Sequence, residues 1–520
     1  MRVGIDLGTT NTVVSYIDEN GSWKLLEFRR CGRTENLYLL PSCIAERNGV
    51  IVVGQQALDH GLAEPSHLLK DKKTDLEPSR DRRTDMELSG SAAKTFTIGR
   101  YTLTPQEVAE YVLKEVHNEL KRQFPKERSF NAYVTVPAKF GQHARAATKA
   151  ALRNAGFDMD ENCLTDEPVA AAIAYSTKLE HDKLVLVVDI GGGTFDLSLL
   201  KSTIVMASGD KSRLIPVSWG GDPHLGGNNF DDLLVKKMAM TFLQDGGPDL
   251  YVQHGSTLPT PAETRAAAIM RAQAFSLKKQ LYTESSEQAS VFVNNLLDGR
   301  NFNFTISVSD YDACMSELAG KMVASIDGLF SKTNYSSGDV DRVLVVGGMA
   351  HEICLKKILE GLFGENRLII PEDSMYLVSR GAAISNSNLR VHVENKAYTS
   401  IGLLKHTGTD VDVIIEEGST VKTGHVFWAE LYPAEDNATA MEIKLVEFTG
   451  KFSPETSTVI LCDTVQLSET AKEWSLCSLF KKKQKPKLLL SIVFTEDKLL
   501  KITVEQPDGD SVDLSLRLGR

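Results

Sequence analysis

The sequence predicts an α/β protein that is followed by a separate β domain. From Met1 to about Asn388, apolar runs rich in Val, Ile and Leu alternate with stretches of helical periodicity. Beyond Asn388 the helical periodicity nearly vanishes, and short strand-like runs follow one another with turn sequences between them. A chain of 520 residues is also too long for one compact core, so two to four domains are expected.

In the N-terminal part, apolar runs predict strands at Val3–Asp6, Thr12–Ile17, Ala132–Val136, Leu184–Ile190, Phe195–Leu200 and Arg342–Val346. Thr104-Pro105-Gln106-Glu107 predicts a helix start, because it offers an N-cap Thr, a Pro at the first helical position and a Glu at the third. Another long helix is predicted from Ala262 to Leu281.

In the C-terminal part, strands are predicted at Val411–Ile415, Val426–Leu431, Met441–Val446, Leu488–Phe494 and Leu499–Glu505. These strands favour a β-sandwich, and the basic run from Lys481 to Lys487 is interpreted as a solvated loop between two of them. The predicted division is a first domain over 1–388, a linker over 389–399 and a β domain over 400–520.

Composition excludes several classes of protein. The net charge of −11, with Lys and Arg scattered among more numerous acids, does not suit nucleic-acid binding. The sequence contains no run of about 18 apolar residues, so no membrane span is predicted. Its N-terminus has no basic segment followed by an apolar run, so no signal peptide is predicted. The 7 cysteines form no Cys-x-x-Cys pair. The expectation is a cytoplasmic protein in a reducing compartment.

Two turns share the same chemistry and predict a phosphate site. GIDLGTTNT (4–12) and DIGGGTFDLSLL (189–200) each place Asp, Gly and Thr directly after an apolar strand. Glycines let consecutive backbone N–H groups point at an anion, and a Thr hydroxyl adds an uncharged donor. Asp6 and Asp189 would repel phosphate but suit the water shell of a Mg²⁺ ion. Gly347 and Gly348 follow a third apolar strand, where backbone can approach a base or ribose. Neither a Walker loop nor a Rossmann fingerprint occurs.

Several segments resemble the DnaK-type seventy-kilodalton heat-shock chaperones. They are GIDLGTTNT, VTVPAKFGQHARAATKAALRNAG (134–156), TDEPVAAAIAY (165–175), VVDIGGGTFDLSLL (187–200), GGDPHLGGNNFDD (220–232) and VVGGMA (345–350). Actin-like ATPases and sugar kinases share the two hairpins but not the VPAxF or EPxAAAxAY segments. The resemblance implies an actin/hexokinase-like ATPase domain of two lobes, with ATP or ADP and Mg²⁺ between them, followed by a substrate-binding β-sandwich.

The resemblance also assigns roles to residues. Those implied to bind the nucleotide are Gly8, Thr9, Thr10, Asn11, Gly191, Gly192, Gly193, Thr194, Gly226, Gly227, Lys278, Gly347 and Gly348. Those implied to act in hydrolysis are Lys73, Glu167, Asp189, Thr194 and Asp196, with Lys70 and Lys72 as alternatives to Lys73. Asp6 and Asp189 would hold Mg²⁺ through water. Pro137 and Arg145 match a relay between nucleotide state and substrate domain.

The chain departs from the family's pattern at several positions. Phe275, Lys279, Met349 and Met375 stand where ribose- or adenine-contacting groups are usual, so weaker ATP binding is expected. In the linker, Arg390 and His392 replace leucines while Val391, Val393 and Glu394 retain part of the pattern, which predicts loose interdomain coupling. The helical lid of the family is expected to be absent, which would make release of bound peptide fast.

The leading hypothesis is an ATP-dependent chaperone that hydrolyses ATP slowly and binds unfolded or extended polypeptides. The implied partners are such clients, a J-domain co-chaperone and a nucleotide-exchange factor. The alternative is a nucleotide-gated scaffold protein with vestigial hydrolysis and a specific partner on the β domain. A small-molecule kinase of the same core fold is disfavoured by the appended β domain.

Overall fold

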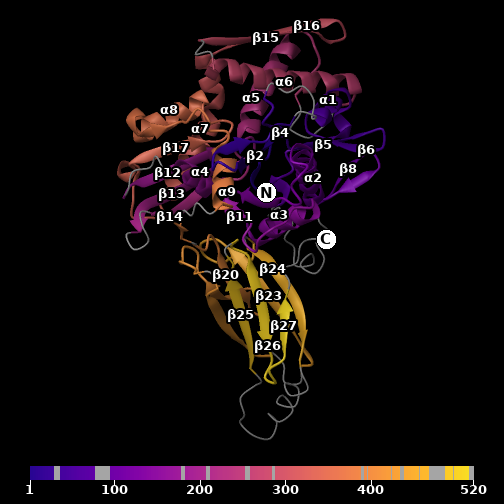
Figure 1. Cartoon of the computed structure of the whole chain (residues 1–520). Coiled ribbons are helices and arrows are strands. Elements are labelled where there is room, and N and C mark those ends of the chain that lie inside the picture. The colour runs from indigo at the N-terminus through magenta and orange to yellow at the C-terminus, as the bar shows by residue number, and fades with distance from the viewer. Residues whose placement is uncertain are drawn as a thin grey trace.

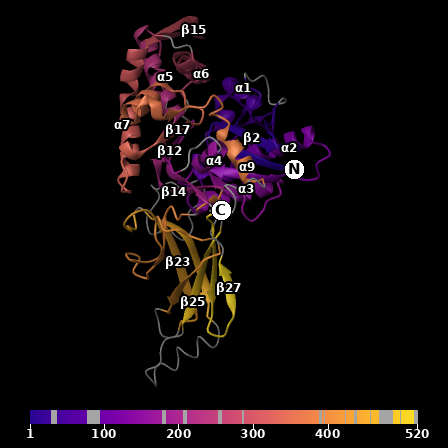
Figure 2. The same cartoon turned by 60° about the vertical axis from the view of Figure 1, so that its left-hand side comes forward.

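We analysed a computed structural model of the whole chain. It describes residues 1–28, 36–76, 94–176, 182–205, 211–251, 258–283, 287–387, 392–394, 396–422, 424–433, 438–455, 457–467, 487–495 and 497–514. Two lobes form the upper body of the molecule, and a β-sandwich lies beneath them (Figures 1 and 2). The predicted fold class, an α/β two-lobed domain followed by a β-sandwich, is confirmed.

The first lobe is built on a mixed sheet. Its strand order is β11 (Leu164–Asp166), β10 (Asn131–Val136), β1 (Arg2–Leu7), β2 (Asn11–Ile17) and β3 (Trp23–Leu25), with β4 (Leu40–Pro41) also paired to β2. β1 and β2 form an antiparallel hairpin, whereas β10 runs parallel to β1 on its other side. The helices α2 (Pro105–Gln123) and α3 (Gln142–Asn154) contribute to the core of this lobe, which the strands line with Val3, Ile5 and Val134.

The second lobe repeats this arrangement. Its sheet has the order β18 (Leu368–Ile369), β17 (Arg342–Val346), β12 (Leu184–Ile190), β13 (Phe195–Val205), β14 (Lys211–Asp222) and β19 (His392–Val393). The β12–β13 hairpin has β17 parallel to β12, just as the β1–β2 hairpin has β10 parallel to β1. The two turns that the sequence singled out therefore occupy equivalent places in two equivalent sheets.

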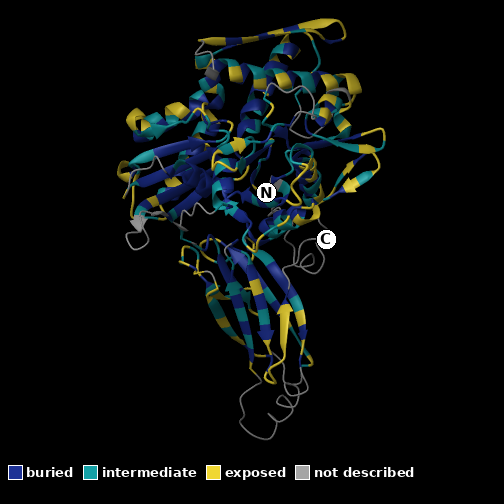
Figure 3. Ribbon diagram, viewed as in Figure 1, coloured by how far each residue is buried: buried dark blue, intermediate teal, exposed yellow. Residues whose placement is uncertain are grey.

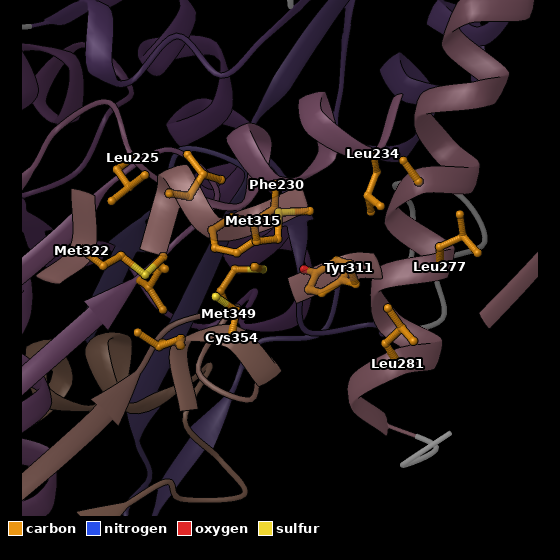
Figure 4. Packing of buried hydrophobic residues seen from close by; sticks show 14 of the residues in the cluster. Leu225, Phe230, Leu234, Leu277, Leu281, Tyr311, Met315, Met322, Met349 and Cys354 are labelled. Atoms are coloured by element: carbon orange, nitrogen blue, oxygen red, sulfur yellow. The ribbon is translucent and has the colours of Figure 1, made fainter. Parts of the chain in front are cut away.

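Helices surround the second sheet and enclose the largest apolar core of the molecule. They are α5 (Gly227–Gln244), α6 (Pro261–Thr283), α7 (Val308–Phe330) and α8 (Ile353–Phe363). Phe230, Tyr311 and Met315 are fully buried among them, as Figure 4 shows. The hairpin of β15 (Gln288–Leu297) and β16 (Arg300–Ser307) lies at the far end of this lobe, above α6 in Figure 1.

Two short helices join the lobes. α4 (Glu167–Tyr175) and α9 (Leu377–Ser385) pack against each other, and α9 also packs on β1 and β2 of the first lobe. Glycine makes these contacts close, because a Cβ on Gly381 would lie 1.8 Å from the carbonyl oxygen of Ala170. A Cβ on Gly4 would lie 2.0 Å from the amide nitrogen of Ala383. The two lobes are thus held together here through helices in near-backbone contact.

Smaller elements lie at the outer end of the first lobe. They are the sheet of β5 (Cys43–Arg47), β6 (Val50–Val53) and β7 (Leu68–Lys70), the hairpin of β8 (Phe96–Ile98) and β9 (Tyr101–Leu103), α1 (Gln55–Ala63), and the short helices η1 (Pro65–His67) and η2 (Thr74–Leu76). Two further short helices, η5 (Ser337–Asp339) and η6 (Glu365–Arg367), lie in the second lobe. α1 and η1 also pack against α6, so the lobes meet there a second time.

The β domain is a sandwich of two four-stranded antiparallel sheets. One sheet has the order β21 (Val411–Ile415), β20 (Ser400–Leu404), β23 (Ala440–Phe448) and β24 (Thr458–Gln466); the other has β22 (Val426–Leu431), β25 (Leu488–Phe494), β26 (Leu500–Glu505) and β27 (Ser511–Leu514). Along β25 and β26 buried side chains alternate with less buried ones, and the buried residues of the two sheets form one core between them (Figure 3). The sequence predicted five of these strands and missed β20, β24 and β27. Most of the basic run, residues 481–486, lies outside the described residues.

The sandwich is docked on the lobes, and the linker takes part in the contact, while the loose coupling expected from its sequence stays a prediction. His392 and Val393 form β19, an edge strand that runs parallel to β14, and the amide of Glu394 donates to the carbonyl oxygen of Leu214. These are backbone contacts, so they do not require the leucines whose loss prompted the expectation. Arg390 and Val391 lie outside the described residues. None of the described helices combines the length and apolar character that crossing a membrane requires.

Candidate nucleotide and metal site

The two glycine-containing turns face each other across the gap between the lobes. The turn after β1 carries Thr9 and Thr10, and the turn after β12 carries Gly191 to Thr194. A Cβ placed on Gly192 would lie 1.8 Å from Oγ1 of Thr10, and one on Gly193 would lie 2.8 Å from Cγ2 of Thr9. Only residues without a side chain fit here. The backbone donors of both hairpins therefore converge on one place.

A cavity opens at this meeting point. It is lined by Asp6, Gly8, Thr9, Thr10, Asn11, Val13, Lys73, Glu167, Asp189, Gly191, Gly192, Thr194, Gly347, Gly348 and Met375. Most of the residues that the sequence assigned to nucleotide, metal or hydrolysis are thus brought together from both lobes. Val13 is an addition that the sequence reasoning missed, because an apolar residue on a strand is indistinguishable from core.

Gly193, Gly226 and Gly227 lie behind this cavity and support its wall. The amide of Gly227, at the start of α5, donates to the carbonyl oxygen of Gly191 at 3.0 Å, and Asn228 donates to Gly192 at 2.7 Å. A Cβ on Gly226 would lie 2.6 Å from the amide nitrogen of Gly193. In the structure these glycines hold the second hairpin against the N-terminus of α5, and the nucleotide contacts that the resemblance implied for them stay a prediction.

Gly347 needs the freedom of glycine. It has a φ of +91°, and a Cβ there would lie 2.4 Å from the carbonyl oxygen of Ile190. Gly348 follows it on the cavity wall. The turn after β17 thus approaches the second hairpin closely, while the approach to a base or ribose that the sequence indicated for this glycine pair stays a prediction.

Lys73 is the lysine that reaches the cavity. Its ammonium group is buried and bonds to Oε1 of Glu167, the first residue of α4. Lys72 points elsewhere: its Nζ lies 3.8 Å from Asp75 and 4.3 Å from the centroid of the Phe96 ring. Lys70 belongs to β7 and does not line the cavity. Of the three lysines that the sequence left open, Lys73 is the one that lines the cavity, and its catalytic role stays a prediction.

Four carboxyl groups surround this single lysine. Burial, then the charge of Glu167, raises the pKa of Asp6 to about 7 and that of Asp196 to about 7. The same two causes raise the pKa of Asp189 well above its usual value. Burial opposes the charge of Lys73, but the nearby carboxylates outweigh it and raise the lysine's pKa. When these carboxyl groups are all ionised, the site therefore holds more negative charge than its own lysine can balance.

This excess suits a divalent cation. Oδ2 of Asp196 is buried without a hydrogen-bond partner in the described part of the chain, and Asp6 accepts a long bond of 3.3 Å from the hydroxyl of Thr135. Mg²⁺ prefers carboxylate oxygens and keeps several waters. The residues present thus fit a hydrated Mg²⁺, with Asp6 and Asp189 on the cavity wall.

The side expected to hold the adenosine is built differently from the phosphate side. Lys278 is fully buried and pairs with Asp231 at 2.8 Å, and it also donates to the carbonyl oxygen of Gly227 at 3.2 Å. Phe275, one turn earlier on α6, is 53% exposed. Met349 belongs to the core of the second lobe, whereas Met375 lines the cavity. Lys278 therefore acts here as an internal counter-ion for α5, which the sequence did not foresee.

Comparison with known families agrees with this geometry. A family model described as "Hsp70 protein" matches residues 2–447, which span both lobes and reach into the sandwich at β23. The chain belongs to the Hsp70 family. Hsp70 proteins are chaperones with ATPase activity, and they bind ATP or ADP together with Mg²⁺. The resemblance on which the sequence analysis relied is thus confirmed at the level of the family.

Proposed function

We propose that this Hsp70 protein is an ATP-dependent chaperone that hydrolyses ATP to control the binding of unfolded or extended polypeptide segments. The observation that carries the proposal is the meeting of the two hairpins around Lys73 and its carboxylates. The proposal includes the division into a nucleotide-binding domain over 1–388, a linker over 389–399 and a substrate-binding domain over 400–520. We also propose that the protein works in the cytoplasm with a J-domain co-chaperone and a nucleotide-exchange factor.

On the phosphate side, the proposed roles follow from charge and position. The amides of Gly8 to Asn11 and of Gly191, Gly192 and Thr194 bind the phosphates, and Lys73 balances charge that develops on the transferred group. When bound, Mg²⁺ supplies further charge neutralisation and fixes the phosphates in one geometry. Glu167 and Asp196 orient the attacking water, and Glu167 at the same time holds Lys73 in place.

A buried ion cluster connects this site to the sandwich. Nη2 of Arg145 lies 2.5 Å from Oδ1 of Asp166, and Nζ of Lys498 lies 2.5 Å from Oδ2 of the same carboxylate. Asp166 immediately precedes Glu167, whereas Lys498 belongs to the β25–β26 turn of the sandwich. We propose that a shift of Glu167 on nucleotide binding also moves Asp166. Because Asp166 pairs with Lys498, this movement would change the position of the substrate domain. Arg145 is the residue that the sequence matched to such a relay.

Further contacts make this interface extensive. Asp497 accepts hydrogen bonds from the amides of Cys163 at 2.6 Å and Leu164 at 2.9 Å, and it also pairs with Lys149. Gln142, the first residue of α3, donates from its side chain to the carbonyl oxygen of Lys498 at 2.7 Å and accepts from the amide of Leu500 at 3.1 Å. Most of these hydrogen bonds join a side chain of one domain to the backbone of the other. They can form together only when the sandwich has this orientation relative to the lobes.

The proposal is tested by ATPase turnover of the full chain with and without an extended apolar peptide. We expect slow hydrolysis that the peptide stimulates and that Asp189→Ala and Thr194→Ala each reduce by at least about a hundredfold, as loss of a positioned charge or donor does. Exposed Thr407 on the β20–β21 turn offers a matched control, Thr407→Ala, that should hydrolyse ATP like wild type.

Other results would contradict the proposal. Nucleotide binding without turnover, unaffected by peptide, would support a nucleotide-gated scaffold protein instead. Transfer of the phosphoryl group to a small hydroxyl compound would indicate a kinase of the same core fold. The exposed Phe275 on α6 gives the scaffold alternative its one structural argument, because a large apolar ring on the surface is suited to a protein contact.

A further inference from the structure

A cluster of histidines and carboxylates lies at the outer end of the first lobe, away from the nucleotide cavity. It consists of His60 on α1, Glu64 at the C-cap of that helix and His67 in η1. One ligand atom from each of these three residues lies within 4.8 Å of the others. We propose that these three residues bind a first-row divalent transition metal, for which Zn²⁺ is the reference ion, with Glu46 as the neighbouring carboxylate.

The backbone brings the three residues together. The amide of Glu64 donates to the carbonyl oxygen of His60 at 2.9 Å and ends α1, and the amide of His67 donates to that of Glu64 at 3.0 Å. Pro65 begins η1 between them, so the chain reverses over a few residues. The turn is tightly packed, since a Cβ on Gly61 would lie 2.5 Å from Cδ2 of Leu68. The histidines are therefore held close by main-chain structure.

The distances fit a metal ion. Nε2 of His60 and Nδ1 of His67 each lie 3.7 Å from Oε2 of Glu64. Ligand atoms about 2.0–2.2 Å from a tetrahedral Zn²⁺ are separated by roughly 3.4 Å, so small side-chain movements complete the site. At 3.7 Å neither pair forms a hydrogen bond. The two ring nitrogens are therefore near enough to Glu64 to share a metal ion with its carboxylate, but too far from it to form hydrogen bonds.

One ring nitrogen points into the cluster without a partner. Nε2 of His60 is buried and makes no hydrogen bond in the described part of the chain. A buried polar atom without a partner is costly, and a metal ion would satisfy it. In a merely structural cluster this nitrogen would be expected to face water or an acceptor.

Glu46 supplies the support and charge that such sites use. Its side chain is 10% exposed, and Oε2 lies 2.8 Å from Nδ1 of His67. Its other oxygen accepts from the amide of Gly49, and a Cβ on Gly99 would lie 2.7 Å from Oε2, so the carboxylate is closely confined. Oε2 of Glu46 and Oε2 of Glu64 both face Nδ1 of His67, so a metal bound at Nδ1 replaces the contact with Glu46, and the Glu46 carboxylate stays beside the ion and contributes charge. Two neutral histidines with two carboxylates balance a divalent cation in charge.

The ligand types also select the metal. Imidazole with carboxylate suits Zn²⁺, Ni²⁺, Cu²⁺ or Fe²⁺, whereas Mg²⁺ and Ca²⁺ prefer sites with oxygen ligands alone. Three protein ligands leave room for water in the remaining positions. The site would tie α1 to η1, the segment that packs on α6 of the other lobe and leads through β7 toward Lys73.

The test is titration of the chelator-treated full chain with Zn²⁺ in the presence of excess Mg²⁺, which occupies sites made of oxygen ligands alone. We expect one Zn²⁺ to bind with a Kd in the micromolar range or below, and His60→Ala and His67→Ala each to weaken it at least about a hundredfold. Glu46→Gln should weaken it about tenfold, the scale of losing a residue that supports a ligand. His406→Ala, which removes an exposed histidine on the β20–β21 turn, should bind as wild type does.

Two further measurements keep the proposal falsifiable. Co²⁺ in place of Zn²⁺ should produce visible absorption bands of a four- or five-coordinate ion in wild type that His67→Ala lacks. The melting temperature of wild type should rise on adding Zn²⁺, while that of correctly folded His67→Ala should not. Equal Zn²⁺ affinity in wild type and His67→Ala, or wild-type affinity no better than millimolar, would overturn the proposal.

Discussion

At the scale of single residues, the candidate site depends on one lysine among four carboxyl groups. Lys73 is buried and bonded to Glu167, whereas its neighbour Lys72 pairs with Asp75 outside the cavity. Only a cation inside the cavity can act on a phosphoryl group at short range. Replacing these two adjacent lysines is therefore predicted to have different effects on ATP turnover.

Replacing Lys73 by Ala is expected to lower ATP turnover by at least about a hundredfold, because charge stabilisation at the transferred group is lost. Lys72→Ala is expected to retain turnover close to that of wild type. Single-turnover hydrolysis measures both, and a thermal melt identifies a variant that fails only because it is unfolded. Equal rates for the two folded variants would remove Lys73 from the proposed mechanism.

The raised pKa values of the carboxyl groups predict how stability depends on pH. Burial and mutual repulsion raise the pKa of Asp6 and Asp196 to about 7, compared with about 3.8 for an ordinary Asp. Between about pH 4 and 7 the native state thus holds protons that the unfolded chain has released. The free energy of unfolding contributed by these groups therefore falls as the pH rises through this window.

Asp196→Asn removes one of these groups with little change of shape. Without nucleotide or Mg²⁺, we expect the melting temperature of wild type to fall relative to that of Asp196→Asn by a few degrees between pH 5 and 7.5. Asp327→Asn, on the exposed face of α7, is the control and should follow wild type. Parallel melting curves for wild type and Asp196→Asn at all pH values would contradict the assigned pKa shift.

At the scale of elements, the contact between α4 and α9 sets how the lobes are joined. A Cβ on Gly381 would lie 1.8 Å from the backbone oxygen of Ala170, and a backbone cannot yield as a side chain can. Gly328 is also helical, but a Cβ there would meet nothing within 4 Å. The same substitution at these two glycines should have opposite effects.

Gly381→Ala is expected to destabilise the two-lobed domain by at least about 3 kcal/mol, because overpacking forces the two helices apart. Gly328→Ala should stabilise α7 by about 0.5–1 kcal/mol, since alanine favours a helix over glycine. Urea unfolding of both variants measures these changes. A neutral Gly381→Ala would show that α4 and α9 can separate without loss of stability.

The sequence predicted most of these elements because their signals are local. The capping box at Thr104 is present: its side chain accepts from the amide of Glu107, whose carboxylate accepts from the amide of Thr104. The strand of 184–190 is apolar except for Asp189 and was predicted with its observed bounds. β20 and β27 were missed, since short strands with mixed side chains carry little periodicity.

At the scale of the whole molecule, the interface between lobes and sandwich depends on Lys498. Its ammonium group lies 3.4 Å from the centroid of the Tyr398 ring and is paired with Asp166. Burial, only partly offset by Asp166 and reinforced by the positive charge of Arg145, lowers the pKa of Lys498 to about 8. In an undocked sandwich this lysine would return to an ordinary pKa of about 10.4.

Docking should therefore become more favourable as the pH rises from about 8 to 9.5, because the undocked form holds a proton that the docked form has released. Lys498→Met has no such proton and should lose this dependence. Small-angle X-ray scattering across this range measures the docked population of each protein. The phenol of Tyr398 stays neutral here, since burial raises its pKa well above 10. An identical pH response in both proteins would contradict the role of Lys498.

The sequence by itself determined the family, the fold class and the two glycine-containing hairpins. These follow from contiguous residues: an apolar strand, an Asp, glycines and a Thr define a hairpin without reference to the rest of the chain. The tertiary structure decided which lysine enters the cavity, that Gly226 and Lys278 support the site from behind, and that Lys498 reaches Asp166. Such choices depend on packing between segments hundreds of residues apart, where a shift of one residue exchanges a buried side chain for an exposed one.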